Sequence, residues 1–583
     1  MAITFDRWVS DNDPSTRFPL YTRANVGEVF PDPVFPFTRS AALLNMSEMG
    51  WRDAFVRMGA FELSEFRPDD LDIIGVFGGY CYLNASVTRL FGERAPGLSW
   101  QAMDAQFFGT QPGIPPYVEM PGDVRPDLSE KIGAWLGYVL TADSLPELLE
   151  DQAETKRLRA ARPDLSAMSD QELVDRGIAL YGGSMLRHLF AQHLHTTYAS
   201  TVPLGILAGV TAAVGRPELV TALISGVGDI DSAAPSMAMW DLSRQARRSP
   251  TLTALFDGGA AGLSDRLAAS DDADVEAFSS AFADFLYEYG SRGPNEWDSA
   301  RPTWETHPSL ALAAIDRMRL VDDSADPSGH QQVLAAGRPA ALAEMRKILE
   351  AAGVDDETKG QFEMAFVAGS VWLPGRERSK TNCVRHIQEV RVAMREFGRR
   401  MVERGHFDDV EDFAFLFVNE FPAFFADPPS FKATIAERKA QWQELAACDP
   451  QFLFNEAPDF PAAWTRKDAV TYEQLVAGEV LQGTPGCVGV AEGIARVVLD
   501  SNDPSALGPG EILVAPITDP SWTPLFVPAA GVVVDVGAPM SHAVIVSREL
   551  GIPCVISATG GTKRIPDGAK IRVDGTNGTV TIL

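Results

Sequence analysis

The sequence predicts a multidomain α+β protein, in which a large, mostly helical region precedes a small mixed domain of strands and helices. The length, 583 residues, allows roughly three or four domains of ordinary size. Between about residues 145 and 450, apolar residues recur at three- and four-residue spacing, as in 275–289 and 384–402, which is typical of amphipathic helices. From Gly486 onward, short β-rich runs separated by glycine and proline replace that pattern.

The composition excludes several classes of protein. Hydrophobic residues make up 45% and charged residues 22%, as in ordinary globular chains. The 50 Lys and Arg against 79 Asp and Glu give a net charge of −29, which argues against a nucleic-acid-binding surface. Five cysteines without a CxxC pair exclude a disulfide scaffold and a cysteine zinc site. No secretory leader opens the chain, so we expect a soluble cytoplasmic protein without a membrane segment.

The first part of the chain is predicted to be irregular and the middle part helical. Residues 1–144 are rich in proline, glycine and aromatic residues, with extended pieces at 71–75 and 80–83. The remainder of the region 1–454 is predicted to be mostly helical, interrupted by loops at 291–308 and 374–381. The aromatic stretches 77–82 and 181–198 would either line a pocket or belong to the core.

The end of the chain is predicted to form a compact α/β domain. Residues 455–483 have turn residues and little periodicity, so we expect a linker or hinge there. The domain itself spans 484–583. Its predicted helices lie at 522–529 and 541–550. Its predicted strands lie at 487–490, 494–499, 512–516, 532–536, 554–557, 571–573 and 579–583.

One segment of this domain has a pattern that predicts chemistry. The apolar run 532–536 leads into a tight loop that ends at Ser541, a good N-cap, and an amphipathic helix follows from His542. The first turn of a helix favours an anion and disfavours a positive imidazolium. A neutral imidazole is a nucleophile, and a phosphoryl group attached to it would lie on that anion site. The alternative is a histidine that only closes the turn and packs.

The segment 537–553 resembles the phosphohistidine segment of the PEP-utilising enzymes, which include phosphoenolpyruvate synthase, pyruvate phosphate dikinase and rifampin phosphotransferase. The stretch 484–498 is similar to the usual start of their mobile domain, so the resemblance covers 484–583. It implies a small swivelling β/β/α domain in which His542 is the phosphohistidine. Met540-Ser541-His542 is closer to the rifampin phosphotransferase form than to the Thr-Cys-His form.

The resemblance extends upstream with fewer matching residues, and it implies that 1–454 is an acceptor domain. Residues 25–36 look like the opening of the substrate domain of rifampin-phosphotransferase-like proteins. Residues 290–298 resemble its Gly-His-Arg-Gly-x-x-Glu stretch, with Ser291 in place of the histidine. Residues 376–380 resemble its Arg-Glu-x-x-Lys motif, and 405–412 resemble the structural turn that follows.

These motifs supply the candidate site residues. Arg376 and Lys380 are four residues apart and could clamp a phosphate from one side of a helical turn; the alternative is an exposed basic turn. Glu377 could orient Arg376 or accept the proton of the acceptor. Arg292 and Glu296 would form either a second site or a buried ion pair.

The remaining candidates are Ser541 and three histidines of the helical region. Ser541 is expected to cap the helix and to bond the phosphoryl group. His188, His193 and His195 lack the spacing of a metal motif, so structural or pocket-lining roles are expected and no metal site is predicted.

The resemblance also implies a split enzyme. The similarity to the substrate domain begins near residue 22 and no P-loop string occurs, and we expect no phosphoenolpyruvate barrel after residue 583. A separate ATP-grasp subunit would therefore bind ATP and Mg²⁺ and phosphorylate His542. Two-subunit relatives of this layout, phenylphosphate synthase and the 4-methylphenol-phosphorylating system, act on phenols. This implies a hetero-oligomeric phosphotransferase of aromatic catabolism with a small phenolic substrate.

Two alternatives stay open. One keeps the phosphohistidine chemistry but uses an antibiotic, a polyol or another alcohol as the acceptor. The other is a non-enzymatic phosphocarrier or regulatory protein, which would not need the clamp at Arg376 and Lys380.

Overall fold

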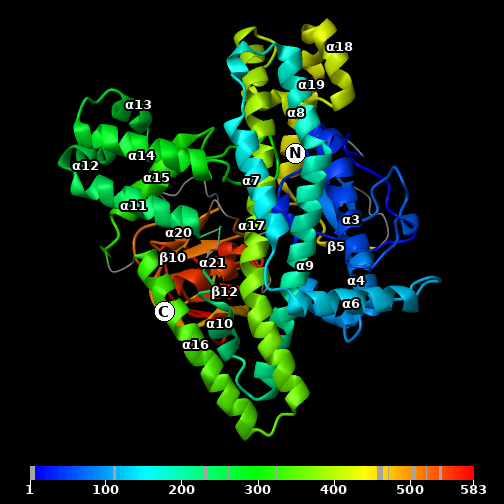
Figure 1. The fold of residues 1–583 in the computed structure, drawn as a ribbon. Coiled ribbons are helices and arrows are strands. Elements are labelled where there is room, and N and C mark those ends of the chain that lie inside the picture. Colours follow the sequence, from blue (N-terminus) through cyan, green and yellow to red (C-terminus); the bar gives the residue numbers. More distant parts are fainter. Residues whose placement is uncertain are drawn as a thin grey trace. The chain divides into compact units, whose positions relative to one another are not determined.

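The computed structural model describes residues 7–108, 113–228, 231, 233–259, 261–323, 326–455, 464–469, 472–499, 507–519, 522–537 and 541–583. The chain forms two compact units that interleave in sequence (Figure 1). Unit 1 comprises Met1–Ala199, Trp297–Arg301 and Arg378–Val470, and unit 2 comprises Ser200–Glu296, Pro302–Glu377 and Thr471–Leu583. The domain boundaries expected from the sequence, 1–454, 455–483 and 484–583, are a different kind of division and stay a prediction.

Unit 1 is mostly helical. Its elements are β1 (Tyr21–Thr22), α1 (Val26–Val29), α2 (Pro36–Thr38), η1 (Arg39–Glu48), α3 (Met49–Arg57), η2 (Leu63–Glu65), β2 (Ile74–Phe77), β3 (Tyr80–Asn84), α4 (Ala85–Arg94), α5 (Trp100–Phe108), α6 (Pro126–Thr141), α7 (Pro146–Ala160), η3 (Leu165–Ala167), α8 (Asp170–Tyr181), the first half of α9 (Ser184–Ala213), the second half of α17 (Asp356–Glu403), η5 (Val410–Phe415), η6 (Val418–Glu420), α18 (Phe421–Ala426), η7 (Pro428–Phe431), α19 (Lys432–Ala446), β4 (Cys448–Asp449), β5 (Leu453–Phe454) and β6 (Thr465–Arg466).

A small sheet of order β2-β3-β1-β5 lies in the core of unit 1. The extended pieces predicted near residues 71–75 and 80–83 correspond to its strands β2 and β3. Phe77, Tyr80 and Tyr82 are fully buried in one cluster with Trp8 and Phe454. The aromatic stretch 77–82 is therefore part of the core, which is the second of the two readings that the sequence allowed.

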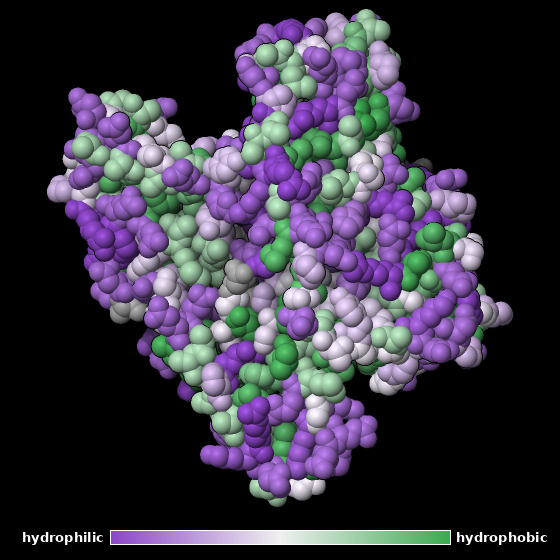
Figure 2. Space-filling view, viewed as in Figure 1, coloured by the Kyte–Doolittle hydropathy of each residue, from purple (hydrophilic) through white to green (hydrophobic). Residues whose placement is uncertain are grey.

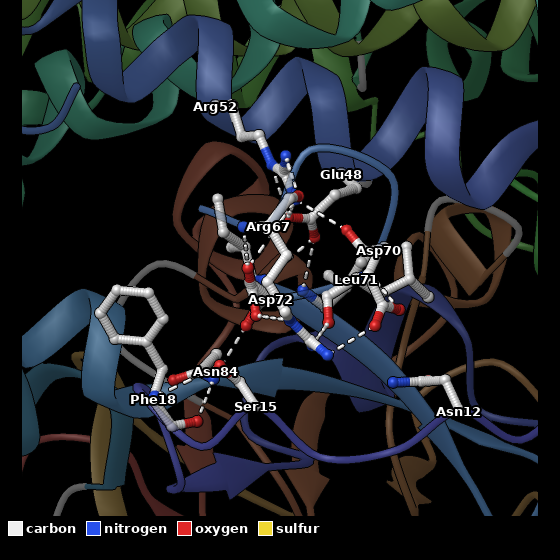
Figure 3. A network of polar contacts seen from close by, with 12 residues as sticks. Asn12, Ser15, Phe18, Glu48, Arg52, Arg67, Asp70, Leu71, Asp72 and Asn84 are labelled. Carbon is white, nitrogen blue, oxygen red and sulfur yellow. Dashed lines mark hydrogen bonds and ion pairs between the residues drawn. The ribbon is translucent and has the colours of Figure 1, made fainter. Parts of the chain in front are cut away.

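A network of buried charges fixes the β2 strand to helix α3 and the turn before it (Figure 3). The Glu48 carboxylate accepts hydrogen bonds from the backbone N–H groups of Ile73 and Ile74 and from the Arg52 guanidinium. Arg67 in turn donates to the Asp72 carboxylate at 2.8 Å. Buried charges are stable only when they are paired and hydrogen-bonded, and this network meets that condition.

The predicted loop at 374–381 is wrong. Residues 374–381 lie inside α17, a continuous helix of 48 residues that contains Pro374. Proline removes only one backbone donor and can be accommodated in a long helix when the surrounding packing supports it. Apolar residues at helical spacing also predict one helix over 171–190, but this segment is divided between two helices, because α8 ends at Tyr181 and α9 begins at Ser184.

Unit 2 combines a helical bundle with the C-terminal sheet. Its helices are the second half of α9, α10 (Leu219–Ile224), α11 (Ala234–Arg248), α12 (Pro250–Asp257), α13 (Leu263–Ala268), α14 (Ala273–Tyr289), α15 (Pro308–Arg319), α16 (Pro327–Ala351) and the first half of α17. The residues between α14 and α15 form turns and irregular backbone, so the loop predicted at 291–308 is confirmed.

The C-terminal sheet has the strand order β7-β14-β13-β9-β10-β11-β12-β8. Strands β9 to β12 run parallel, and the outer strands are antiparallel. The strands are β7 (Val480–Gln482), β8 (Thr484–Cys487), β9 (Val490–Val497), β10 (Ile512–Ala515), β11 (Gly531–Val534), β12 (Cys554–Ile556), β13 (Lys570–Asp574) and β14 (Thr579–Ile582); the helices are α20 (Thr523–Phe526), α21 (His542–Leu550) and α22 (Gly561–Arg564). The mostly helical region followed by a β-rich domain is therefore confirmed.

Alternation along the central strands explains how this sheet is covered. Ile512 and Val514 point into one core, whereas Leu513 and Ala515 point into another, because side chains alternate between the faces of a strand. The second core contains α20 and α21 together with residues of α11, α14 and α15. The sheet domain thus packs through α20 on α11 and α15, and through α21 on α16.

The molecular surface agrees with the strongly acidic composition. Hydrophilic residues cover most of the face shown in Figure 2, and apolar residues occur there in small groups. Among the described residues, no helix is long and apolar enough to cross a membrane.

Candidate functional site

His542 is the first residue of α21, at the edge of the sheet where the parallel strands β10 and β11 end. Loops at the carboxyl ends of parallel strands are the usual place for ligands in α/β folds. The sequence predicted a helix at 541–550 with Ser541 as its N-cap, and Ser541 does occupy that position in an extended conformation. Its side chain, however, makes no capping hydrogen bond. Met540 lies outside the described residues.

Both nitrogens of the His542 imidazole face threonine hydroxyls. Thr518 Oγ1 lies 3.1 Å from Nδ1, and Thr523 Oγ1 lies 3.0 Å from Nε2. The ring also meets Phe526 edge-on, with 5.7 Å between the centroids. A neutral imidazole has one N–H and one lone pair, and a hydroxyl can serve either as donor or as acceptor. The two threonines therefore suit a neutral ring whose plane is fixed.

A third hydroxyl belongs to Ser541, the residue that directly precedes His542. Ser541 Oγ is buried and forms no hydrogen bond within the part of the chain that the structure describes. It is adjacent to the first backbone N–H groups of α21, which the helix itself leaves unsatisfied. A buried donor without a partner costs free energy, so its retention here is consistent with a polar group that arrives during function.

The base of the loop before Ser541 is held by a strained residue. Ser557 adopts a φ of 51°, in the left-handed region, and its Oγ donates to the Gly537 carbonyl at 2.7 Å. A Cβ at Gly537 would come within 3.2 Å of Ser541 Oγ. Close packing thus explains the glycine, and the strained serine ties the end of β12 to the start of this loop.

A loop of the helical bundle reaches the same region of unit 2. The Asn295 backbone N–H donates to the Asp519 carboxylate at 3.3 Å, and Asp519 directly follows Thr518. In the same loop Arg292 and Glu296 form an ion pair of 3.0 Å, with side chains 3% and 1% exposed. Of the two readings that the sequence left open, this geometry corresponds to the buried ion pair.

The remaining predicted residues lie on α17. Arg376 and Lys380 are on one continuous helix at a spacing of four residues, and both are half-buried. The Arg376 guanidinium lies 3.5 Å from the Glu377 carboxylate, which is buried. Arg376 and Lys380 are therefore not part of an exposed turn. Because α17 runs through both units, their role as a phosphate clamp stays a prediction.

The three histidines of α9 have separate surroundings in unit 1. His188 pairs with Asp151 at 3.0 Å, and this carboxylate raises the pKa of His188. His193 Nδ1 lies 3.1 Å from Ser379 Oγ. The Trp135 indole N–H donates to His195 Nε2 at 2.9 Å, and burial lowers the pKa of His195 to about 3. Among the residues that the structure describes, no group of three or more His, Cys, Asp or Glu side chains is arranged to hold a metal ion.

The sequence analysis missed four residues of this site: Thr518, Asp519, Thr523 and Asn295. A signal was available for Thr518 and Asp519. Thr518 and Asp519 closely follow the carboxyl end of the buried strand β10, where polar residues point to a binding edge. No pattern in the sequence indicated that the backbone of Asn295 would meet Asp519, because that contact joins residues 224 positions apart.

Comparisons with known proteins agree with this geometry. The family described as "Rifampicin phosphotransferase fourth domain" matches residues 192–373, and that described as "PEP-utilising enzyme, mobile domain" matches residues 507–578. The second match includes Thr518, Thr523 and His542. Over these two segments the chain is similar to rifampicin phosphotransferases and to other PEP-utilising enzymes.

Individual relatives match over different lengths. An uncharacterised protein of Mycobacterium tuberculosis is 27% identical over 608 residues, covering 98% of this chain and 62% of that protein. A rifampicin phosphotransferase of Streptomyces sviceus is 31% identical over 304 residues, covering 51% of this chain and 34% of that protein. A Streptomyces rifampicin phosphotransferase is 28% identical and covers 75% of this chain and 51% of that protein. The chain therefore spans between a third and about three fifths of the length of these relatives.

Proposed function

We propose that this chain is a phosphotransferase in which His542 receives a phosphoryl group and passes it to a hydroxyl of a small molecule. The observation that supports this most is the place of the imidazole, at the first position of α21 with hydroxyls on both nitrogens. The preceding residue, Ser541, has a buried Oγ that forms no hydrogen bond among the described residues. The first-turn N–H groups and these three hydroxyls would surround a phosphoryl group with donors.

Charging is the first step of the proposed reaction. The unprotonated nitrogen of His542 attacks a phosphorus atom of the donor, an N–P bond forms, and the P–O bond to the leaving phosphate or nucleotide breaks. The threonine on the attacking nitrogen gives up its contact with the ring, and its hydroxyl is then free to donate to a phosphoryl oxygen. The other threonine orients the second ring nitrogen, because its hydroxyl oxygen accepts the hydrogen bond from that N–H.

Transfer is the second step. The acceptor hydroxyl attacks the phosphorus, an O–P bond forms, and the N–P bond breaks with return of the electron pair to the imidazole nitrogen. The hydroxyl proton passes to a base, for which Glu377 is our candidate. Arg376 and Lys380 would neutralise the equatorial oxygens, since Arg can contact two of them and Lys supplies a point charge.

The donor and the acceptor belong to the same proposal. We propose that a separate ATP-grasp subunit with ATP and Mg²⁺ charges His542. We propose a phenolic compound such as 4-methylphenol as the acceptor. The name of the Streptomyces relatives supports an antibiotic as the second candidate.

The experiment that tests this function combines the purified chain with the ATP-grasp partner, ATP and Mg²⁺. Panels of phenols and of rifamycin antibiotics are added separately, and phosphate esters are detected by mass spectrometry. We expect esters with at least one panel and none with the His542→Ala variant. Ester formation by His542→Ala at the wild-type rate would contradict the proposal.

A further inference from the structure

The side chain of Asp519, in the sheet domain, accepts a hydrogen bond from the loop 290–296 of the helical bundle. The Asn295 N–H lies 3.3 Å from Asp519 Oδ2, and Asn295 holds a φ of 54° to present it. A left-handed conformation costs about 1 kcal/mol or more in a residue other than glycine, so it persists only where the surrounding contacts fix it.

The loop that presents this N–H is rigid. Its backbone is paired with the segment before α15, because Trp304 N donates to the Arg292 carbonyl and Glu305 N donates to the Gly290 carbonyl, each at 2.9 Å. A Cβ at Gly293 would approach the Pro302 carbonyl oxygen to 2.3 Å, which shows how closely the two strands of the loop pack. The donor to Asp519 is therefore held in place by contacts within the loop itself.

On the other side, Asp519 is coupled to the imidazole through a short piece of chain. The preceding residue, Thr518, holds Nδ1 of His542. The Asp519 carbonyl accepts the Trp522 N–H at 2.9 Å, and Trp522 directly precedes Thr523, which holds Nε2. Asp519 is thus next to one of the two threonines that orient the ring and is hydrogen-bonded to the residue before the other.

We propose that Asp519 is a positioning residue: its bond to Asn295 fastens the sheet domain to the helical bundle and sets the two threonines that orient His542. The apolar contacts of α20 with α11 and α15 provide the buried area of this docking surface. They do little to fix the orientation of the sheet domain on the bundle, because burial of apolar area is not directional. The Asp519 bond supplies the direction. This inference rests on the proposed function only where it concerns phosphoryl transfer.

Hydrogen exchange of the intact chain tests the docking role without any phosphoryl donor. We expect Asp519→Ala to accelerate exchange about tenfold to a hundredfold at the Asn295 amide and in α20, with the amides of β10 and β11 unchanged. Asn295→Gly keeps the N–H and removes the strain, so it should exchange as the wild type does. Glu492→Ala, which removes an exposed carboxylate from β9, is the control for charge.

The outcomes separate the alternatives. Unchanged exchange at residue 295 in Asp519→Ala would overturn the proposal. If Asp519→Ala also accelerates exchange in β10 and β11, the sheet domain has unfolded, and Asp519→Asn, which has the same size, becomes the test variant. Wild-type exchange at residue 295 together with wild-type ¹⁵N chemical shifts of the His542 imidazole in Asp519→Asn would overturn the proposal. Altered imidazole shifts in Asp519→Asn support it. A failure of phosphoryl transfer in the wild type would contradict the proposed function and leave these exchange results unaffected.

Discussion

Thr518 Oγ1 and His542 Nδ1 lie 3.1 Å apart. This contact joins the segment after the parallel strand β10 to the first residue of helix α21. Thr523 makes the matching contact on Nε2 at 3.0 Å. A solvent-exposed histidine rotates freely and exchanges tautomers, whereas this ring is held between two hydroxyls. The pair of contacts prepares the imidazole for attack in one orientation.

Removal of either hydroxyl should slow charging. Thr518→Val and Thr523→Val preserve shape but leave one ring nitrogen without its partner, and we expect each to lower the rate of His542 phosphorylation by about tenfold. Thr518→Ser and Thr523→Ser retain the hydroxyl and should restore most of the rate. Rapid-quench measurements of phosphohistidine formation check this. Wild-type rates in both valine variants would show that the contacts do not prepare the ring.

Ser541→Ala should separate stability from chemistry. Because Ser541 Oγ forms no hydrogen bond among the described residues, its removal should change the free energy of unfolding by less than about 1 kcal/mol. The same variant should reduce the rate of charging about tenfold, since a donor to the phosphoryl group is lost. Urea denaturation and phosphohistidine formation measure the two effects. A large loss of stability with normal charging would assign Ser541 a structural role only.

Arg376 and Lys380 should act after charging. We expect Arg376→Ala and Lys380→Met to leave phosphorylation of His542 unchanged and to slow ester formation about a hundredfold, because a positive charge on the transferring group is lost. Arg376→Lys, which keeps the charge but not the bidentate geometry, should be intermediate. Product formation from pre-charged protein is the measurement. Slow charging combined with normal product formation would rule out the clamp.

The buried His195 should make unit 1 sensitive to acid. Burial lowers its pKa from 6.5 to about 3, so below pH 6.5 the unfolded chain binds a proton that the folded chain does not. Stability from this group is therefore present above pH 6.5 and is lost as the pH falls toward 3, by up to about 2 kcal/mol between pH 6.5 and pH 5.

His195→Gln tests this dependence, because glutamine can still accept the Trp135 indole N–H but cannot be protonated. Its free energy of unfolding should fall less than that of the wild type between pH 7 and pH 5. His188 is a control of opposite sign, since Asp151 raises its pKa and its contribution is lost as the pH rises. His188→Gln should therefore be most destabilised at low pH. Parallel pH dependence in all three proteins would refute the assignment.

The sequence predicted the sheet domain well because alternation and turn residues are local signals. Strands such as β10 and β11 consist of apolar residues bounded by glycine and proline, and the helix at His542 begins after a serine. The prediction failed at 374–381, where Gly375, Arg376 and Lys380 suggested a turn. The buried surroundings of α17 decide in favour of a helix there, and that tertiary effect has no local signature.

The site shows the same division. His542 could be identified from its neighbours in the sequence. The contacts that Thr518 and Thr523 make with it, from 24 and 19 residues away, become visible only when β10 and α21 meet. The contact between Asn295 and Asp519 depends on the packing of the helical bundle on the sheet domain, so no single-sequence pattern could reveal it.

The most direct measurement of the central claim is the site of phosphorylation. The intact chain is charged with the ATP-grasp partner and labelled ATP, or chemically with phosphoramidate as a donor that needs no partner, and the adduct is located by mass spectrometry at alkaline pH. The account predicts an acid-labile, alkali-stable phosphate on His542 that disappears when acceptor is added and ester forms. Ester formation by the complete system while His542 remains unlabelled would contradict it.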